Sequence, residues 1–397
     1  MRVGIFSESY QPLINGVTTS VNTLVAELER AGHSVFIFTS RFPNYTDERP
    51  GVFRFPSINS MVEPDYVLPI PISPHIQSSI ARLKLDIVHS QSPFFLGVVA
   101  RQVARRYGIP HVSTNHTLYS EYTHYVPIAP KAWTGAVLSR WMRGFYNSCD
   151  QVIAPSEMTK RVLLDEYKVE RPITVVPTGI PEPPYVLASE EETRRSLGIP
   201  ADARVLLYVG RLAPEKNLPV LIDAFARIAA REPKAVLVLA GSGKSAESLR
   251  AHIHTLGLSD RAVFTGFLGR TKLDPLYLLS EVFVFPSKTE TQGLAIGEAL
   301  AAGTPCVIVN AGGAPESIHD GEDGFLVEDD PQEMADRVLS LLDNDLLRKQ
   351  MSERGRYNAR ALRPERVAQR VIQVYENLLG KPSAPTEEGE NREGEGR

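Results

Sequence analysis

The chain has 397 residues, enough for two domains of ordinary size that each bury a core of their own. Hydrophobic residues make up 43% and charged residues 23%, a balance typical of a folded globular protein. The net charge of −4 gives no general attraction for nucleic acid, and the two cysteines, Cys149 and Cys306, form no disulfide or zinc pattern.

The N-terminal half alternates short apolar runs with amphipathic stretches, which is typical of βα units that build a parallel sheet. Expected strands there are Arg2–Ser7, Ser34–Thr39, Asp86–Ser90, His111–Thr114, Gln151–Ala154 and Ile173–Val176. The start of the chain lacks the basic region and long apolar core of a signal peptide. Since no apolar run reaches the roughly 18 residues of a membrane span, we expect a cytoplasmic protein, with any contact to the inner face of the cell membrane being peripheral and made through the N-terminal domain.

The second half repeats the same alternation after a proline-rich break, Pro181-Glu-Pro-Pro-Tyr, which marks a domain boundary. Expected strands there are Arg204–Val209, Ala235–Ala240, Ala262–Thr265, Val282–Phe285, Pro305–Val309 and Gly324–Val327. The predicted domains are 1–182 and 183–362, followed by a helix over 363–380 and a disordered Pro/Glu/Gly-rich tail over 381–397. The predicted fold is α/β, with two facing doubly wound, Rossmann-like parallel-sheet domains and a cleft between them.

The strongest motif follows the expected strand Val282–Phe285. It places Glu290 and Glu298 eight positions apart, with Gly293 opening a helix between them. Free N–H groups at such a helix start, here around Gly293, Leu294 and Ala295, can receive a phosphate. The two carboxylates can then flank that phosphate and hold a sugar and a ribose.

A second motif, Tyr208-Val-Gly-Arg-Leu-Ala-Pro-Glu-Lys-Asn, places Arg211 and Lys216 at the carboxyl end of a strand. Two cations there can neutralise a diphosphate leaving group, which makes a metal ion dispensable. We expect no metal and no cofactor: Asp343-Asn-Asp lies between two helical stretches, and the spacing of His111, His116 and His124 gives no metal pattern.

Gly210-Arg211, Glu215-Lys216-Asn217, Glu290 with Glu298, and the following Ala-Gly-Thr-Pro together resemble glycosyltransferase family 4. The resemblance covers nearly the whole chain and implies the two-domain GT-B fold, with the last helix crossing back onto the first domain. It also implies a retaining, metal-independent hexosyltransferase that uses a nucleotide sugar, with UDP favoured by its frequency in the family.

Position by position, the resemblance implies that Arg211 and Lys216 bind the donor diphosphate, and that both take part in catalysis together with Glu290 and His116. Glu298 would hold the ribose hydroxyls, and Glu290 the hydroxyls of the transferred sugar. The stretch from Gly293 to Ala295 would supply backbone contacts to phosphate or sugar.

In the same way, Phe267 resembles the family's nucleobase contact, Gly16 would let the chain approach the diphosphate, and His116 would lie on the acceptor side of the sugar. Each residue also has a plain structural alternative. The glutamates favour a helix start in any protein, the two cations can decorate a helix, Gly16 can be a turn residue, Phe267 a core residue and His116 a satisfied structural histidine.

The acceptor side is expected in the N-terminal domain, where the stretch from His116 to Pro127 resembles bacterial diacylglycerol glycosyltransferases. Tyrosine rings with polar tips suit an interface, and a mixed aromatic and basic helix suits a membrane surface. The candidate residues are Tyr119, Tyr122, Tyr125, Trp133, Arg140 and Trp141. The alternative is that these rings pack a loop and a helix against the domain core.

The predicted function is transfer of a hexose, glucose first, from a UDP-sugar to a lipid such as 1,2-diacylglycerol, with retention of configuration. The weakly basic stretch His75–Leu85, with only Arg82 and Lys84 as cations, argues against a lipid acceptor. The alternatives are the same donor chemistry on a soluble or polysaccharide acceptor, and a noncatalytic nucleotide-sugar binding protein or a phosphorylase of similar fold.

Overall fold

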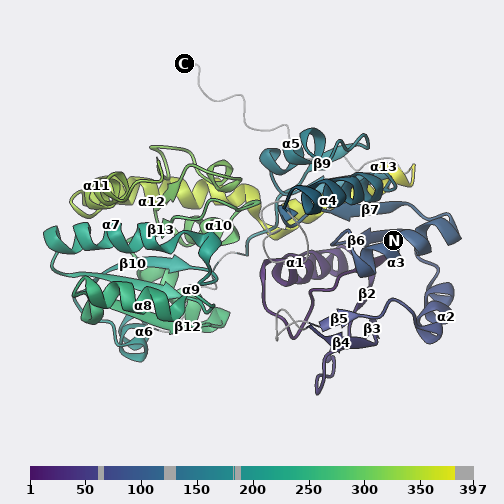
Figure 1. The fold of residues 1–397 in the computed structure, drawn as a ribbon, viewed down its shortest axis with the longest axis horizontal. Coiled ribbons are helices and arrows are strands. Elements are labelled where there is room, and N and C mark those ends of the chain that lie inside the picture. Colours follow the sequence, from purple (N-terminus) through teal and green to yellow (C-terminus); the bar gives the residue numbers. More distant parts are fainter. Residues whose placement is uncertain (61–66, 120–130, 182, 184–188, 381–397) are drawn as a thin grey trace, which may run out of the picture.

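The computed structural model describes residues 1–60, 67–119, 131–181, 183 and 189–380, apart from the side chains of 131–134. Two α/β domains lie next to each other (Figure 1), which confirms the predicted fold class. The first domain contains β1 (Arg2–Phe6), α1 (Gly16–Arg30), β2 (Ser34–Ser40), β3 (Val52–Phe55), β4 (Ser57–Asn59), β5 (Val67–Pro69), α2 (Pro74–Leu83), β6 (Ile87–Ser90), α3 (Phe95–Tyr107), β7 (His111–Thr114), α4 (Lys131–Tyr146), β8 (Gln151–Ala154), α5 (Glu157–Asp165) and β9 (Ile173–Val175).

The second domain begins at α6 (Glu190–Leu197) and ends with the helices that lead back to the first. It contains β10 (Arg204–Val209), η2 (Pro214–Lys216), α7 (Leu218–Arg231), β11 (Ala235–Ala240), α8 (Ala246–Thr255), η3 (Ser259–Arg261), β12 (Ala262–Gly266), α9 (Arg270–Leu279), β13 (Val282–Phe285), α10 (Leu294–Ala302), β14 (Cys306–Val309), η4 (Ala314–Ser317), β15 (Gly324–Val327), α11 (Pro331–Leu342), α12 (Asp345–Ala359) and η5 (Arg360–Leu362); α13 (Pro364–Leu378) follows.

Each domain is built on one parallel sheet. The strand order is β3-β2-β1-β6-β7-β8-β9 in the first domain and β12-β11-β10-β13-β14-β15 in the second. Successive strands are added to one side of β1 and then, from β6 onward, to its other side. In the second domain the same change of side occurs between β10 and β13. Ligands of open α/β sheets bind beyond the carboxyl ends of the strands at such a switch point. The sheet order therefore singles out the segments after these four strands.

Three strands in the first domain were not expected from the sequence. β3 is a four-residue edge strand, and β4 and β5 form a separate two-stranded antiparallel sheet. These strands are short, and their apolar residues are interrupted by Arg54 in β3, by the polar ends of β4 and by Pro69 in β5. Ile58 of β4 is also 58% exposed. The pattern rule that finds two-sided buried strands therefore misses them.

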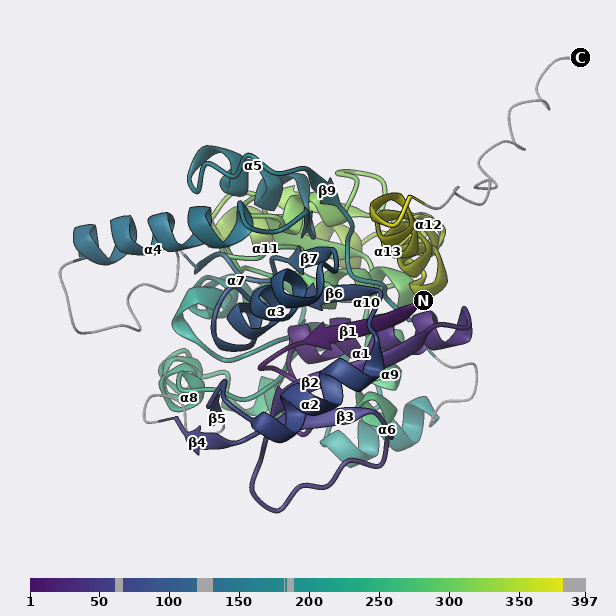
Figure 2. The same cartoon turned by 90° about the vertical axis from the view of Figure 1, so that its right-hand side faces the viewer.

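The helix α13 packs against the first domain, although it follows the second in the chain. Val367, Val371 and Tyr375 belong to the same buried cluster as Val3 and Val21 of β1 and α1. Figure 2 shows α13 beside that end of the first domain. The connection crosses between the domains at the segment that precedes α13, where Ile180 N donates to Leu362 O at 2.7 Å.

Two further features bear on function. The Asp343-Asn-Asp segment is a turn between α11 and α12, in which Asn344 accepts from Leu347 N at 3.0 Å, so it is a helix cap as expected. No helix in the described part of the chain combines the length and apolarity needed to cross a membrane.

Candidate functional site

The carboxyl ends of the two sheets face each other across the domain interface. Thr291, after β13, donates through its hydroxyl to the main-chain oxygen of His116, after β7, at 3.2 Å. Gln292 joins the domains a second time: its amide oxygen accepts from Thr178 N at 2.7 Å and its amide nitrogen donates to Thr178 O at 3.2 Å. The loops after the strands of both domains are therefore held within contact distance.

Lys216 and Glu290 form an ion pair at the switch point of the second sheet. Their side chains are 12% and 15% exposed, and Ser287 Oγ donates to the same carboxylate at 2.8 Å. Lys216 comes from the loop after β10 and Glu290 from the loop after β13, so two neighbouring strands bring together residues 74 positions apart. The sequence motifs named both residues, and the fold places them in direct contact.

Arg211 lies one loop turn before Lys216 and is 56% exposed, with Glu215 paired to it at 2.7 Å. The loop owes its shape to Gly210, because a Cβ there would come within 2.6 Å of the Tyr208 hydroxyl. That hydroxyl in turn donates to Arg211 O at 3.0 Å. Arg211 is thus held by its main chain while its guanidinium remains accessible.

The start of α10 faces the first domain. Gly293 precedes the helix with φ of 82°, a left-handed conformation that favours glycine. The first N–H groups of a helix, here those of Leu294 and Ala295, have no partner within the helix. A Cβ on Gly16, the first residue of α1, would lie 3.5 Å from Leu294 Cδ1. Two helix N-termini therefore meet at the interface, which concentrates positive dipole ends there.

Glu298 is held by two side chains of α9. Its carboxylate accepts from Arg270 at 2.6 Å and from the Tyr277 hydroxyl at 2.8 Å. Burial raises the pKa of Glu298 above its ordinary value, against the lowering effect of Arg270. Phe267, after β12, is 56% exposed, so it is not a core residue. An exposed ring can stack on a base, and a carboxylate held in place can accept from hydroxyl groups.

On the first domain, His116 is partly buried and paired with Gln91, whose amide oxygen lies 2.7 Å from Nε2. Burial lowers the pKa of His116 to about 4, so the ring is neutral at neutral pH. Glu8, after β1, has its two carboxylate oxygens bound to Ser92 Oγ at 2.6 Å and to Leu96 N at 2.7 Å. Glu8 is therefore engaged as a cap of α3.

The aromatic residues expected on the acceptor side have mixed positions. Tyr119 packs edge-on against Phe94, with 5.1 Å between the ring centroids. This contact agrees with the alternative in which the ring packs against the domain core. Trp141 donates through its indole N–H to Pro93 O at 3.1 Å and is 41% exposed, and Arg140 is exposed on the same helix. Tyr122, Tyr125 and the side chain of Trp133 lie outside the described residues.

Three interface residues were not singled out by the sequence. Gln91 follows β6, Gln292 lies inside the motif between Glu290 and Gly293, and Glu316 follows β14 in η4. The Glu316 carboxylate accepts from Glu157 N at 2.7 Å and Met158 N at 2.6 Å, at the first turn of α5. Each of these residues follows a strand, and that position could have marked them as candidates. Their partners could not be predicted, because they follow other strands or lie in the other domain.

Comparison with known proteins agrees with this geometry. Residues 14–182 match the family model described as Glycosyltransferase Family 4, and residues 189–358 match the model of glycosyl transferases group 1. The alpha-monoglucosyldiacylglycerol synthase of Streptococcus pneumoniae is 35% identical over 77% of this chain and 70% of its own. The synthase of the same name from Acholeplasma laidlawii is 29% identical over 96% of this chain and 98% of its own.

Two other similarities show the breadth of the group. A GDP-mannose-dependent alpha-mannosyltransferase of Corynebacterium glutamicum is 29% identical over 83% of this chain and 77% of its own. The solved structure of a sucrose-phosphate synthase from Thermosynechococcus elongatus has the same fold, with a TM-score of 0.77 at 22% identity over 96% of this chain and 99% of that one. With motif residues, fold and family models in agreement, the chain belongs to glycosyltransferase family 4 and is a glycosyltransferase of the GT-B type.

Proposed function

We propose that the enzyme transfers glucose from UDP-glucose to a lipid acceptor such as 1,2-diacylglycerol, with retention of configuration at the sugar. The observation that carries this proposal is the similarity to two alpha-monoglucosyldiacylglycerol synthases, one of them over nearly the full length of both chains. The paired Lys216 and Glu290 at the switch point support the donor part of it.

In the proposed donor complex, Lys216 and Arg211 neutralise the diphosphate, together with the N–H groups at the start of α10. Lys216 must leave Glu290 to do so, which frees that carboxylate for the hydroxyls of the sugar. Glu298, already oriented by Arg270 and Tyr277, accepts from the ribose hydroxyls. With two cations at the phosphates, the leaving group is stabilised by the protein itself.

For the transfer step we propose attack from the same face as the departing phosphate. The acceptor hydroxyl gives its proton to the leaving phosphate oxygen as its own oxygen bonds to the sugar carbon. Glu8 supports this assignment, because a carboxylate bound to Ser92 Oγ and a helix N–H is placed as a cap and not as a nucleophile. Glu290, paired with a lysine, acts as a positioning group.

The lipid acceptor would approach from the first domain. The exposed residues Val137, Arg140 and Trp141 of α4 suit a membrane surface, where apolar and cationic side chains bind together. Phe94 packs against Tyr119 on one side and stacks with Trp141 on another, so Tyr119 supports this helix from below its exposed residues. The GDP-mannose-dependent relative supplies the second donor candidate, with the same phosphate contacts and a different base and sugar.

The test is turnover of purified enzyme with UDP-glucose, UDP-galactose and GDP-mannose, each with dispersed diacylglycerol. Nucleotide release and the anomeric configuration of the product are measured. Formation of an α-glucosyl lipid supports the proposal, and a β-linked product contradicts retention. Release with GDP-mannose alone would assign the second donor, and donor binding without lipid product would redirect the acceptor search to soluble sugars.

A further inference from the structure

Gln91 is the residue that links the strand ends of the first domain to His116. It follows β6, and its main-chain N–H donates to Phe6 O at 2.9 Å, which extends the pairing of β6 with β1 by one residue. Its side chain is buried, with 3% of the residue exposed. His116 follows β7, the next strand in the sheet, so adjacent strands bring the two side chains to 2.7 Å.

This contact determines which ring nitrogen of His116 carries the proton. An amide oxygen accepts and cannot donate, so Nε2 must be the N–H that faces it. Because burial keeps the ring neutral, a proton on Nε2 leaves Nδ1 as a hydrogen-bond acceptor. Gln91 thereby sets the chemical character of the opposite edge of the ring.

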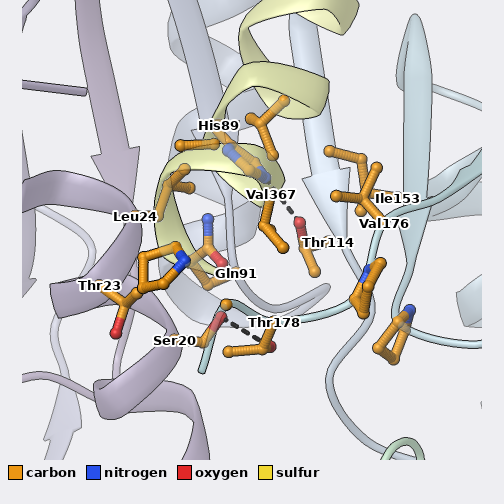
Figure 3. Close-up of a pocket in the computed structure, with 16 residues that line it drawn as sticks. Ser20, Thr23, Leu24, His89, Gln91, Thr114, Ile153, Val176, Thr178 and Val367 are labelled. Carbon is orange, nitrogen blue, oxygen red and sulfur yellow. Dashed lines mark hydrogen bonds between the residues drawn. The ribbon is translucent and has the colours of Figure 1, made fainter. Parts of the chain in front are cut away.

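The other end of the Gln91 amide faces the interior. A cavity of about 30 Å³ lies between the sheet and α13, and Figure 3 shows Gln91, His89 and Thr114 around it. Four of its other polar side chains are paired: His89 Nε2 with Thr114 Oγ1 at 2.7 Å, and Thr178 Oγ1 with Ser20 Oγ at 3.1 Å. Within the described residues, the Gln91 amide nitrogen has no hydrogen-bond partner.

Such a site suits an amide whose nitrogen is turned inward and whose oxygen is turned to the histidine. A cavity of that size has room for one small acceptor, such as a water molecule, beside the nitrogen. The reverse orientation would place N–H donors against Nε2 and would require the proton on Nδ1. The two orientations therefore predict opposite tautomers of His116.

We propose that Gln91 is a positioning residue for sugar transfer, which holds His116 in the tautomer whose Nδ1 accepts a hydrogen bond from a hydroxyl of the bound sugar. The inference rests on the proposed function and on the expected position of His116 on the acceptor side of the sugar. It adds a residue that does not touch the donor but determines how a neighbouring side chain meets it.

Two variants test the proposal. Gln91→Met keeps the length of the side chain and removes the acceptor, so we expect kcat to fall about tenfold, the effect of one hydrogen bond, with the Kd for UDP unchanged. Gln91→Glu places a carboxylate at Nε2, which raises the pKa of His116. A protonated ring donates from both nitrogens, so activity in this variant should fall toward the acidic end of the pH range and recover as the pH rises and the ring loses its proton.

The wild type provides the reference profile. With a His116 pKa of about 4, it should show no loss of activity from this group between about pH 6 and pH 9. The neighbouring His89 also causes no loss of activity in that pH range, because burial lowers its pKa to about 3. An ascending limb in Gln91→Glu alone supports the proposal. Wild-type kcat in Gln91→Met, or parallel pH profiles, overturns it.

Tyr375→Phe is the matched control. The Tyr375 hydroxyl lies 2.7 Å from His89 Nδ1 in the same interior, so its removal also disturbs a buried hydrogen bond but does not touch His116. We expect lower thermal stability with an unchanged pH profile. A loss of kcat in Tyr375→Phe equal to that of Gln91→Met would assign the effect to packing and overturn the proposal.

A readout independent of turnover separates this proposal from the proposed function. In ¹⁵N-histidine-labelled protein, the His116 signals identified with a His116→Gln variant report the tautomer directly. A proton on Nε2 in the wild type that is redistributed in Gln91→Met supports the positioning role even if diacylglycerol is not the acceptor. A proton on Nδ1 in the wild type overturns it even if the glucolipid is formed.

Discussion

Lys216 and Glu290 should respond in opposite ways to removal of their charges. In the free protein they bind each other, but in the proposed complex Lys216 binds the diphosphate and Glu290 binds the sugar. Lys216→Met removes a charge-assisted hydrogen bond to phosphate, worth about 1.5–3 kcal/mol. Glu290→Gln removes the group that competes with the phosphate for Lys216.

The expected magnitudes follow from these contacts. A loss of about 1.5–3 kcal/mol corresponds to a UDP Kd that is about 10- to 150-fold weaker in Lys216→Met. The same variant leaves a carboxylate that is only 15% exposed without its partner. We therefore expect the free energy of unfolding to fall by about 1–3 kcal/mol. Glu290→Gln should bind UDP as tightly as the wild type or more tightly, while its kcat falls.

Titration calorimetry with UDP, thermal unfolding and turnover measure these three effects. Lys288→Met is the control, because Lys288 also pairs with a carboxylate, Asp329, at 2.5 Å, but with 46% and 38% of the side chains exposed. It should lose about 0–1 kcal/mol of stability and no UDP affinity. A UDP Kd in Lys216→Met within twofold of the control, or a weakening in Glu290→Gln equal to that in Lys216→Met, would refute the reasoning.

Three further predictions concern other residues of the candidate site and of the domain interface. Tyr277→Phe removes the hydroxyl that donates to Glu298 at 2.8 Å, so donor affinity measured by calorimetry should fall about fivefold, and unchanged affinity would show that Arg270 alone orients the carboxylate. Phe267→Ala should weaken UDP binding while the melting temperature stays the same, because the ring is 56% exposed; a lower melting temperature with normal binding would make it a packing residue. Glu316→Ala removes the acceptor of two N–H groups at the start of α5, a contact of about 1–2 kcal/mol. Small-angle scattering should then show a larger radius of gyration for the free protein, and an unchanged radius would mean that the other interface contacts hold the domains together.

Much of the architecture is determined by local sequence. The alternation of apolar runs and amphipathic stretches predicted each of the six strands of the second sheet, with ends within one residue of those observed. A buried parallel strand must be apolar on both faces, so its pattern is readable without its neighbours. The same rule missed β3, β4 and β5, whose edge position and solvent-facing surface remove that pattern.

The candidate donor residues were also readable, because their motifs are local. Lys216 and Glu290 each follow a strand, and strands next to each other in a parallel sheet bring their carboxyl ends together. The sequence did not show that the two form an ion pair in the free protein. That pairing depends on β10 and β13 being neighbours, although two strands, three α-helices and two 3-10 helices separate them in the chain.

Only the tertiary structure decided the partners of the remaining residues. Gln91 meets His116 because β6 and β7 are adjacent, and Glu316 caps α5 because the domains face each other. The sequence predicted Trp141 as a ring at an interface, but its indole N–H donates to Pro93 O. Helix periodicity does not predict which neighbour a helix face will contact. The composition of a segment and the spacing of its apolar residues determine which face it can bury. Strand order and domain packing determine which side chains meet at a site, because they bring together residues that are far apart in the sequence.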